Sequence, residues 1–261
     1  MTTDLARSVS SFTIIKGALI EPTYTIFQHW DHSLTLSENI RRIHEENRFA
    51  GTSEGWAVMV GRAIRRLYDP SSRDRPLVEL AKANCDLEVW RPLLLWHMTR
   101  NEFLLRDFLV NWLYPQYQQG ALRLHLTEVQ AYLDTLKKKK NVIWSGAWTD
   151  STRSRVAAGL LAIARDFGLL RGKVKKEFAS YHLPEESFLY LLHAMAERQP
   201  NARRLVESED WHLFLMDASD VEHQLLRLHQ FHRLGYETAG SLAQLQLPSP
   251  DLATFVKDRT S

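Results

Sequence analysis

The chain has 261 residues, with 33 Lys or Arg against 31 Asp or Glu and a hydrophobic fraction of 44 %. These values indicate an ordinary globular protein of one large domain or two smaller ones. The single cysteine, Cys85, excludes an intramolecular disulfide and a cysteine-rich zinc knuckle. The chain has no apolar run of about 18 residues and no secretory-type apolar core at its start. We therefore expect a cytoplasmic protein without a membrane partner.

Residues 12–70 are predicted to form an N-terminal helical unit. Its first part, 12–30, is either a short strand that leads into a helix or a helix entered at Pro22, because proline suits a first helical turn.

Two helices joined by a glycine-containing turn follow, Arg41–Arg48 and Glu54–Tyr68, and they resemble a helix-turn-helix. Gly51 is expected to close the first, and Thr52 or Ser53 to cap the second. The second helix has exposed arginines that either bind a polyanion or only keep the helix soluble. These are Arg62, Arg65 and Arg66.

Residues 77–120 are predicted to form a central helical core. Apolar residues recur on both sides of the helical pattern, which is typical of helices buried on more than one face. Pro115 is expected to end this run. His97 lies among the apolar residues, and we interpret it as a hydrogen-bonded core histidine in preference to a ligand.

Residues 121–183 begin with a short extended piece, Leu122–Leu126. A helix follows with Thr127 as its cap and Gln130 at the third helical position, in the pattern of a capping box. It continues into the lysine run Lys137–Lys140, whose charge also complements the dipole at a helix C-terminus.

Positive charge is concentrated in residues 137–176. Eleven Lys or Arg against two Asp give this stretch a net charge of +9, whereas the whole chain carries +2 and the remainder therefore −7. Such segregation favours a basic face that meets a polyanion, because each neutralised phosphate releases counterions. The alternative is a solvated charged surface, which is the commoner role of lysine runs.

A helix is predicted over 152–167, with Gly168 as a left-handed C-terminal cap. Its apolar stripe comprises Val156, Leu160, Ile163 and Phe167. Its suitable N-caps are Thr149, Asp150 and Ser151. The β-compatible segment Val174–Leu183 follows. The order of a helix, a short aromatic segment, a second helix and a basic hairpin is that of a winged helix-turn-helix.

In helix-turn-helix proteins the first residues of the second helix meet the DNA. Asn or Gln, which would read adenine, is missing there, so we expect phosphate-dominated binding with little sequence preference. The predicted DNA-binding residues lie on this helix (Ser151, Thr152, Arg153, Ser154, Arg155), in the hairpin (Arg171, Lys173, Lys175, Lys176), in the lysine run (Lys137, Lys138, Lys139, Lys140) and on the N-terminal unit (Arg62, Arg65, Arg66).

Residues 184–261 are predicted to form a C-terminal helical region and tail. Ser219-Asp220 is expected to cap a helix over 220–234 that Gly235 closes, and 241–261 reads as a loosely packed tail or as a strand or helix offered to a partner. Three histidines in this region offer a metal site as the alternative, namely His223, His229 and His232. Acidic residues near a helix start are also what capping favours, so we predict no metal and no cofactor.

The chain resembles the BrxA family, accessory proteins of bacterial BREX phage-defence systems. The resemblance extends from about Phe12 to Pro248 and rests on Ser11–Leu19, Leu93–Phe108, Asp150–Leu170 and Leu213–Asp217. The chain departs from the family at Glu102-Phe103, where members have Pro-Phe. The resemblance implies an all-helical protein with helix-turn-helix and winged-helix parts that binds double-stranded DNA with little sequence preference and has no known catalysis.

We therefore expect a mostly α-helical, non-enzymatic DNA-binding protein with an N-terminal helix-turn-helix-like unit and a winged-helix-like unit with a small β-hairpin. Its expected partners are double-stranded DNA and other BREX proteins. The alternatives are an adaptor that docks a larger defence component and an RNA-binding protein. A metal-dependent nuclease is a weaker alternative, because no HExxH motif, Gly-rich phosphate loop or nucleophile elbow is present.

Overall fold

The computed structural model describes residues 8–49, 53–144, 146–240 and 242–260. The helices are α1 (Phe12–Lys16), α2 (Ile20–Gln28), α3 (Leu36–Glu45), α4 (Glu54–Leu67), α5 (Arg75–Lys82), α6 (Leu87–Thr99), α7 (Phe103–Phe108), the π-helix η1 (Leu109–Leu113), α8 (Tyr114–Gln118), α9 (Leu126–Lys137), α10 (Asp150–Asp166), α11 (Glu185–Ala196), α12 (Ala202–Val206), the 3₁₀-helix η2 (Glu209–Phe214), α13 (Ala218–Gln230) and α14 (Leu252–Thr260). The strands are β1 (Ser8–Val9), β2 (Ile143–Trp144), β3 (Leu170–Arg171), β4 (Glu177–Phe178), β5 (Gly235–Ala239) and β6 (Leu242–Gln246), paired in twos. The prediction of a mostly α-helical chain is confirmed.

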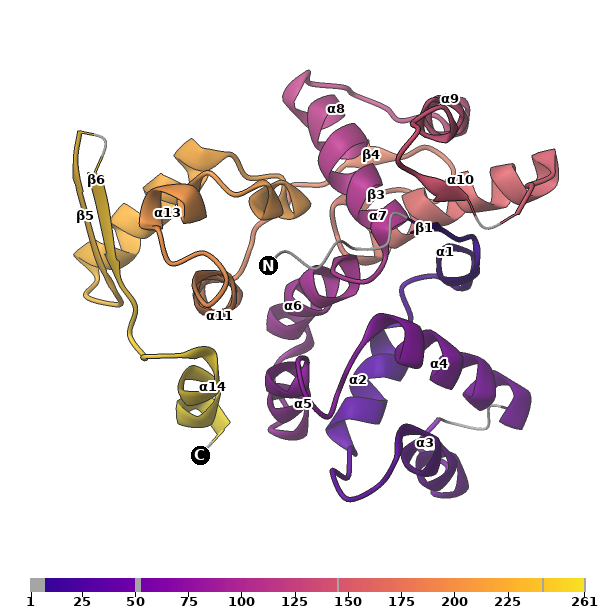
Figure 1. The fold of residues 1–261 in the computed structure, drawn as a ribbon, viewed down its shortest axis with the longest axis horizontal. Helices are drawn as coiled ribbons and strands as arrows, with labels where there is room; N and C mark the ends of the chain where they lie inside the picture. Colours follow the sequence, from indigo (N-terminus) through magenta and orange to yellow (C-terminus); the bar gives the residue numbers. More distant parts are fainter. Residues whose placement is uncertain (1–7, 50–52, 145, 241, 261) are drawn as a thin grey trace.

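Helices α2, α3 and α4 lie together at the lower right of Figure 1. Pro22 occupies the first turn of α2, where the missing N–H breaks no helical hydrogen bond, and the segment before it forms the short helix α1. Helix α4 is capped by Ser53, whose hydroxyl accepts the N–H of Trp56 at 3.3 Å. The predicted helix end at Gly51 and the alternative cap Thr52 lie outside the described residues.

Helices α6 and α7 lie in the middle of the molecule in Figure 1, and the chain continues through η1 to α8 at its upper edge. Helix α6 is enclosed by its neighbours, since Trp90, Leu94 and Trp96 are fully or almost fully buried. Pro115 does not end this run as predicted. It lies in the first turn of α8, where proline is tolerated, and the chain stays helical to Gln118.

A buried polar network joins α6 to the start of α5 and to α11. The two ring nitrogens of His97 lie 2.6 Å from the Asp74 carboxylate and 2.8 Å from the Tyr190 hydroxyl. Arg73 donates to the same carboxylate at 2.7 Å. Burial lowers the pKa of His97. For Asp74, burial acts to raise the pKa, but the hydrogen bonds from His97 and Arg73 leave it below its usual value. The prediction of a hydrogen-bonded core histidine is confirmed.

Helices α9 and α10 and the sheet of β3 and β4 lie at the upper right of Figure 1. The predicted cap of α9 is wrong, because the helix begins at Leu126 and the Glu128 carboxylate accepts the N–H of His125 at 2.8 Å. Strands β3 and β4 are antiparallel, and Leu124 adds a single antiparallel bridge to Lys176. Strand β1 pairs in parallel with β2, which the sequence did not indicate.

The C-terminal region differs from its prediction at two places. Helix α13 starts after its cap Asp217 and ends at Gln230, and Gly235 begins strand β5 instead of closing the helix. The described residues after it, 236–240 and 242–260, do not form a loose tail. Strands β5 and β6 form a hairpin, and α14 packs on α5 and α11 through the buried side chains of Phe255 and Val256 (Figure 1).

Candidate nucleic-acid interface

The ends of α10 are fixed by local hydrogen bonds. The Thr149 hydroxyl accepts the N–H of Thr152 at 3.2 Å, so the helix begins two residues before the predicted start. At the other end Gly168 has φ 82°, and the N–H groups of Gly168 and Leu169 bond to the carbonyls of Arg165 and Ala164. This is the left-handed glycine cap that the sequence predicted.

The inner face of α10 holds it against the rest of the fold. The predicted apolar stripe is buried at all four positions: Val156, Leu160, Ile163 and Phe167. Gly159 lets α1 approach closely, because a Cβ atom there would lie 2.6 Å from the carbonyl oxygen of Ile14.

Three of the predicted DNA-binding residues of α10 are engaged within the protein. The Arg153 guanidinium bonds to both carboxylate oxygens of Asp134 on α9, at 2.8 and 2.9 Å, and to Asp150 at 3.2 Å. The Ser154 hydroxyl accepts a hydrogen bond from Gln130 on α9 at 2.8 Å, and the Thr152 hydroxyl pairs with that of Thr149. Arg153 and Ser154 therefore connect α10 to α9 and are not free donors in this structure, which differs from their expected outward position.

Three residues at helical spacing form the outward face of the first half of α10, namely Ser151, Arg155 and Ala158, and all three are exposed. Arg155 makes no ion pair or hydrogen bond to any described residue. Its neighbours on this face are small, so another molecule could approach the helix backbone closely and still meet the guanidinium.

We use the term wing for β3, β4 and the turn 172–176 between them. Lys176 is the clearest departure from prediction, because its side chain is buried and its ammonium group donates to the carbonyls of Gly172 and Lys173 at 2.7 and 2.6 Å. Burial lowers the pKa of this ammonium group. Arg171 pairs with Glu177 at 3.3 Å. The side chains of Lys173 and Lys175 are exposed, and their ammonium groups have no partner among the described residues.

The lysine run begins at the last residue of α9, Lys137, and all four side chains are exposed. Lys139 lies 3.7 Å from the Asp107 carboxylate, which also accepts a hydrogen bond from Tyr132 at 2.7 Å. No ion pair within the described part of the chain involves the other three, Lys137, Lys138 and Lys140. With Arg155, Lys173 and Lys175, six basic side chains between 137 and 176 are both exposed and unpaired.

The three arginines of α4 are exposed, but they differ in their contacts. Arg66 lies 3.6 Å from Glu102, a fully buried carboxylate that also accepts a hydrogen bond from Thr13. Burial raises the pKa of Glu102. Arg65 donates to the Ser37 hydroxyl at 2.9 Å, and Arg62 has no partner in the described residues. Arg66 therefore lies beside a buried carboxyl group that the sequence gave no reason to expect.

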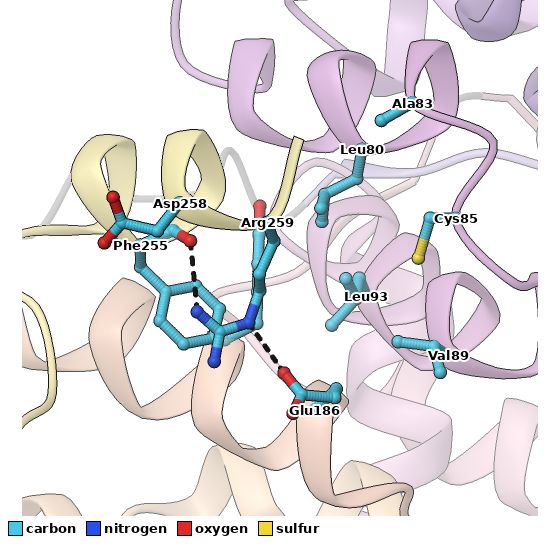
Figure 2. Close-up of a pocket in the computed structure, with 10 residues that line it drawn as sticks. Leu80, Ala83, Cys85, Val89, Leu93, Glu186, Phe255, Asp258 and Arg259 are labelled. Atoms are coloured by element: carbon cyan, nitrogen blue, oxygen red, sulfur yellow. Dashed lines mark hydrogen bonds and ion pairs between the residues drawn. The ribbon is translucent and has the colours of Figure 1, made fainter. Parts of the chain in front are cut away.

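A cavity of about 500 Å³ lies between α5, α6, α11 and α14 (Figure 2). Its wall is mainly apolar, and Arg259 bonds to Glu186 at 2.6 Å on one side (Figure 2). The described residues hold no group of three or more His, Cys, Asp or Glu side chains placed to bind a metal ion. His229 instead accepts the backbone N–H of Tyr236 at 3.1 Å. None of the described helices combines the length and the apolar character that a membrane span requires.

Comparison with known proteins gave one family. The sequence model of the BrxA family matches residues 11–194, which include the N-terminal helices, the central helices, the unit of α9, α10 and the wing, and most of α11. No curated protein matched the chain.

Proposed function

The chain belongs to the BrxA family, which associates it with BREX phage-defence systems, and we propose that it is a non-catalytic accessory protein that binds double-stranded DNA through α10, the wing and the lysine run. The observation that carries this proposal is the set of six exposed and unpaired basic side chains in one stretch of 40 residues. Acidic partners neutralise most of the other basic groups of this stretch.

The element order supports a winged helix-turn-helix. The helical run of α7, η1 and α8 comes first, then the bridging residue Leu124, then α9 and α10, and finally strands β3 and β4. In such a unit the second helix of the pair lies in the major groove, which is wide enough for an α-helix. The outward face of α10 carries small residues, which let the helix approach the groove, and Arg155 lies between them.

The same geometry favours duplex DNA over duplex RNA. The major groove of A-form RNA is deep and narrow and does not admit a helix, whereas that of B-form DNA does. Among the predicted DNA-binding residues in the first turns of α10, Arg155 is the one whose guanidinium has no partner in the described chain. Few side chains of α10 are therefore free to contact the DNA bases. We infer phosphate-dominated binding with little sequence preference.

The test is an electrophoretic mobility shift with unrelated DNA duplexes, matched single strands and an RNA duplex, each at two salt concentrations. We expect every DNA duplex to bind with similar affinity at low salt and to be released at high salt. Binding of RNA duplex with equal affinity would contradict the choice of DNA. No shift of any nucleic acid at low salt would overturn the proposal and favour an adaptor that uses the basic stretch to dock an acidic protein.

A further inference from the structure

The turn of the wing is held rigidly at its base. Gly172 has φ 88°, and a Cβ atom there would lie 2.0 Å from the carbonyl oxygen of Lys175, so only glycine allows this chain path. The buried ammonium group of Lys176 binds the carbonyls of Gly172 and Lys173 from inside the turn. The backbone N–H of Leu124 donates to the Lys176 carbonyl at 2.9 Å and ties the turn to the segment before α9.

This rigid turn displays an apolar side chain. Val174 is 94 % exposed, more than any other large hydrophobic side chain in the described chain, and it stands between Lys173 and Lys175. A single exposed apolar residue is ordinary on a protein surface. Here, however, the turn that carries Val174 is held by the buried Lys176 and by Gly172, which has no space for a side chain. The turn is therefore ordered before any partner arrives, which lowers the entropic cost of a contact at its tip.

We propose that Val174 enters the minor groove of bound duplex DNA, while Lys173 and Lys175 contact the phosphates of the two strands that border it. This inference rests on the DNA-binding function proposed above. The minor groove is about 6 Å wide, which admits a narrow loop tip but not a helix. Its sugars offer apolar surface in every sequence, so a valine there adds affinity without selecting a sequence. Apolar side chains are a recurrent means of contact in this groove.

The proposal separates two contributions by their response to salt. Lysine–phosphate contacts release counterions and weaken as salt rises, whereas contact of a valine with sugar surface does not depend on salt in this way. We expect Val174→Ser to weaken binding by about tenfold at every salt concentration, because the contact removes most of an apolar side chain from water. Replacement of Lys173 and Lys175 together by Ala should lower the salt slope by about 1.8.

The experiment is fluorescence anisotropy of the full chain with a labelled AT-rich duplex over a salt series. Leu242→Ser is the matched control, because this exposed leucine lies on β6, away from the wing (Figure 1), and it should bind as the wild type does. Val174→Leu should keep the affinity. A duplex saturated with distamycin, which fills the minor groove, should bind the wild type and Val174→Ser equally.

The outcomes separate this inference from the proposed function. If Val174→Ser binds as the wild type while the double lysine variant binds weakly, the groove contact is wrong and DNA binding stands. If Val174→Ser still weakens binding in the presence of distamycin, the side chain contacts another part of the DNA and the inference fails. If the wild type binds no duplex, both are overturned.

Discussion

Arg155→Ala gives the most direct test of the outward face of α10. Arg155 is exposed and unpaired in the described chain, and its removal leaves the buried face of the helix unchanged. If all six exposed and unpaired basic side chains contact phosphates, the logarithm of the DNA association constant should fall with the logarithm of the salt concentration with a slope of about −5. Loss of Arg155 should reduce the magnitude of that slope by about 0.9.

The size of the affinity change follows from the slope. We take a contact that acts only through counterion release and adds no affinity at about 1 M salt. At about 0.1 M salt this contact raises the DNA association constant about eightfold, or by about 1.2 kcal/mol. The wild type and Arg155→Ala should therefore differ most at low salt and converge as salt rises. Fluorescence anisotropy with one labelled duplex over a salt series measures both quantities.

Arg204→Ala is the matched control for Arg155→Ala. Arg204 is exposed on α12, which packs on α11, α13 and β6, and it forms no ion pair in the described residues, so this variant loses the same charge on another part of the fold. Its slope should equal that of the wild type. Equal slopes for all three proteins would refute the assignment of Arg155, and an equal decrease in both variants would show that net charge, not position, governs the binding.

Three further predictions concern the stability of the fold. Gly159→Ala should lower the free energy of unfolding by about 1–3 kcal/mol, because the new methyl group would collide with the backbone of α1. Its control, Gly55→Ala, has open space around it and should not destabilise the protein. Thermal denaturation compares the two variants, and equal behaviour would show that α1 moves freely. Arg153→Ala should cost about 1 kcal/mol through the lost ion pairs to Asp134 on α9 and to Asp150 on α10, and urea denaturation measures this loss. A change in DNA salt slope as large as that of Arg155→Ala would contradict the structural role of Arg153. Burial holds the pKa of His97 below its unfolded value of about 6.5, so the unfolded chain gains a proton that the folded chain does not. The stability that is present above that pH is therefore lost as the pH falls, and His97→Gln should make the decrease in unfolding free energy between about pH 6.5 and 5.5 shallower by up to about 1.4 kcal/mol per pH unit. An unchanged decrease would show that His97 is protonated in the folded state.

Most of the helical content could be predicted from the sequence, because its causes are local. An apolar stripe at helical spacing and a glycine after it are enough to place α10 and its end, and both were found as predicted. The errors at Thr127 and Pro115 come from equally local alternatives. A glutamate at the third helical position can form the capping box two residues earlier, and a proline can open a helix as well as end one.

The candidate interface was predictable only as a charge count. The sequence placed eleven basic residues between 137 and 176, but it could not tell a free cation from a paired one, because the partner lies on another element. Arg153 and Arg155 look equivalent in the sequence and differ in the fold, where Asp134 of α9 reaches only the first.

The sequence by itself determined that this chain is mostly helical with one strongly basic stretch, since composition, periodicity and caps act over a few residues, and its resemblance to the BrxA family agrees with the family match over residues 11–194. Only the tertiary structure decided which charges remain available. It buried Lys176 inside the wing to bind backbone carbonyls, and it enclosed Glu102 between Thr13 and Arg66. It also left Val174 exposed in the turn that Lys176 binds from inside. The physical reason is that desolvation and pairing depend on neighbours that are distant in the chain, and these neighbours exist only once the helices have packed.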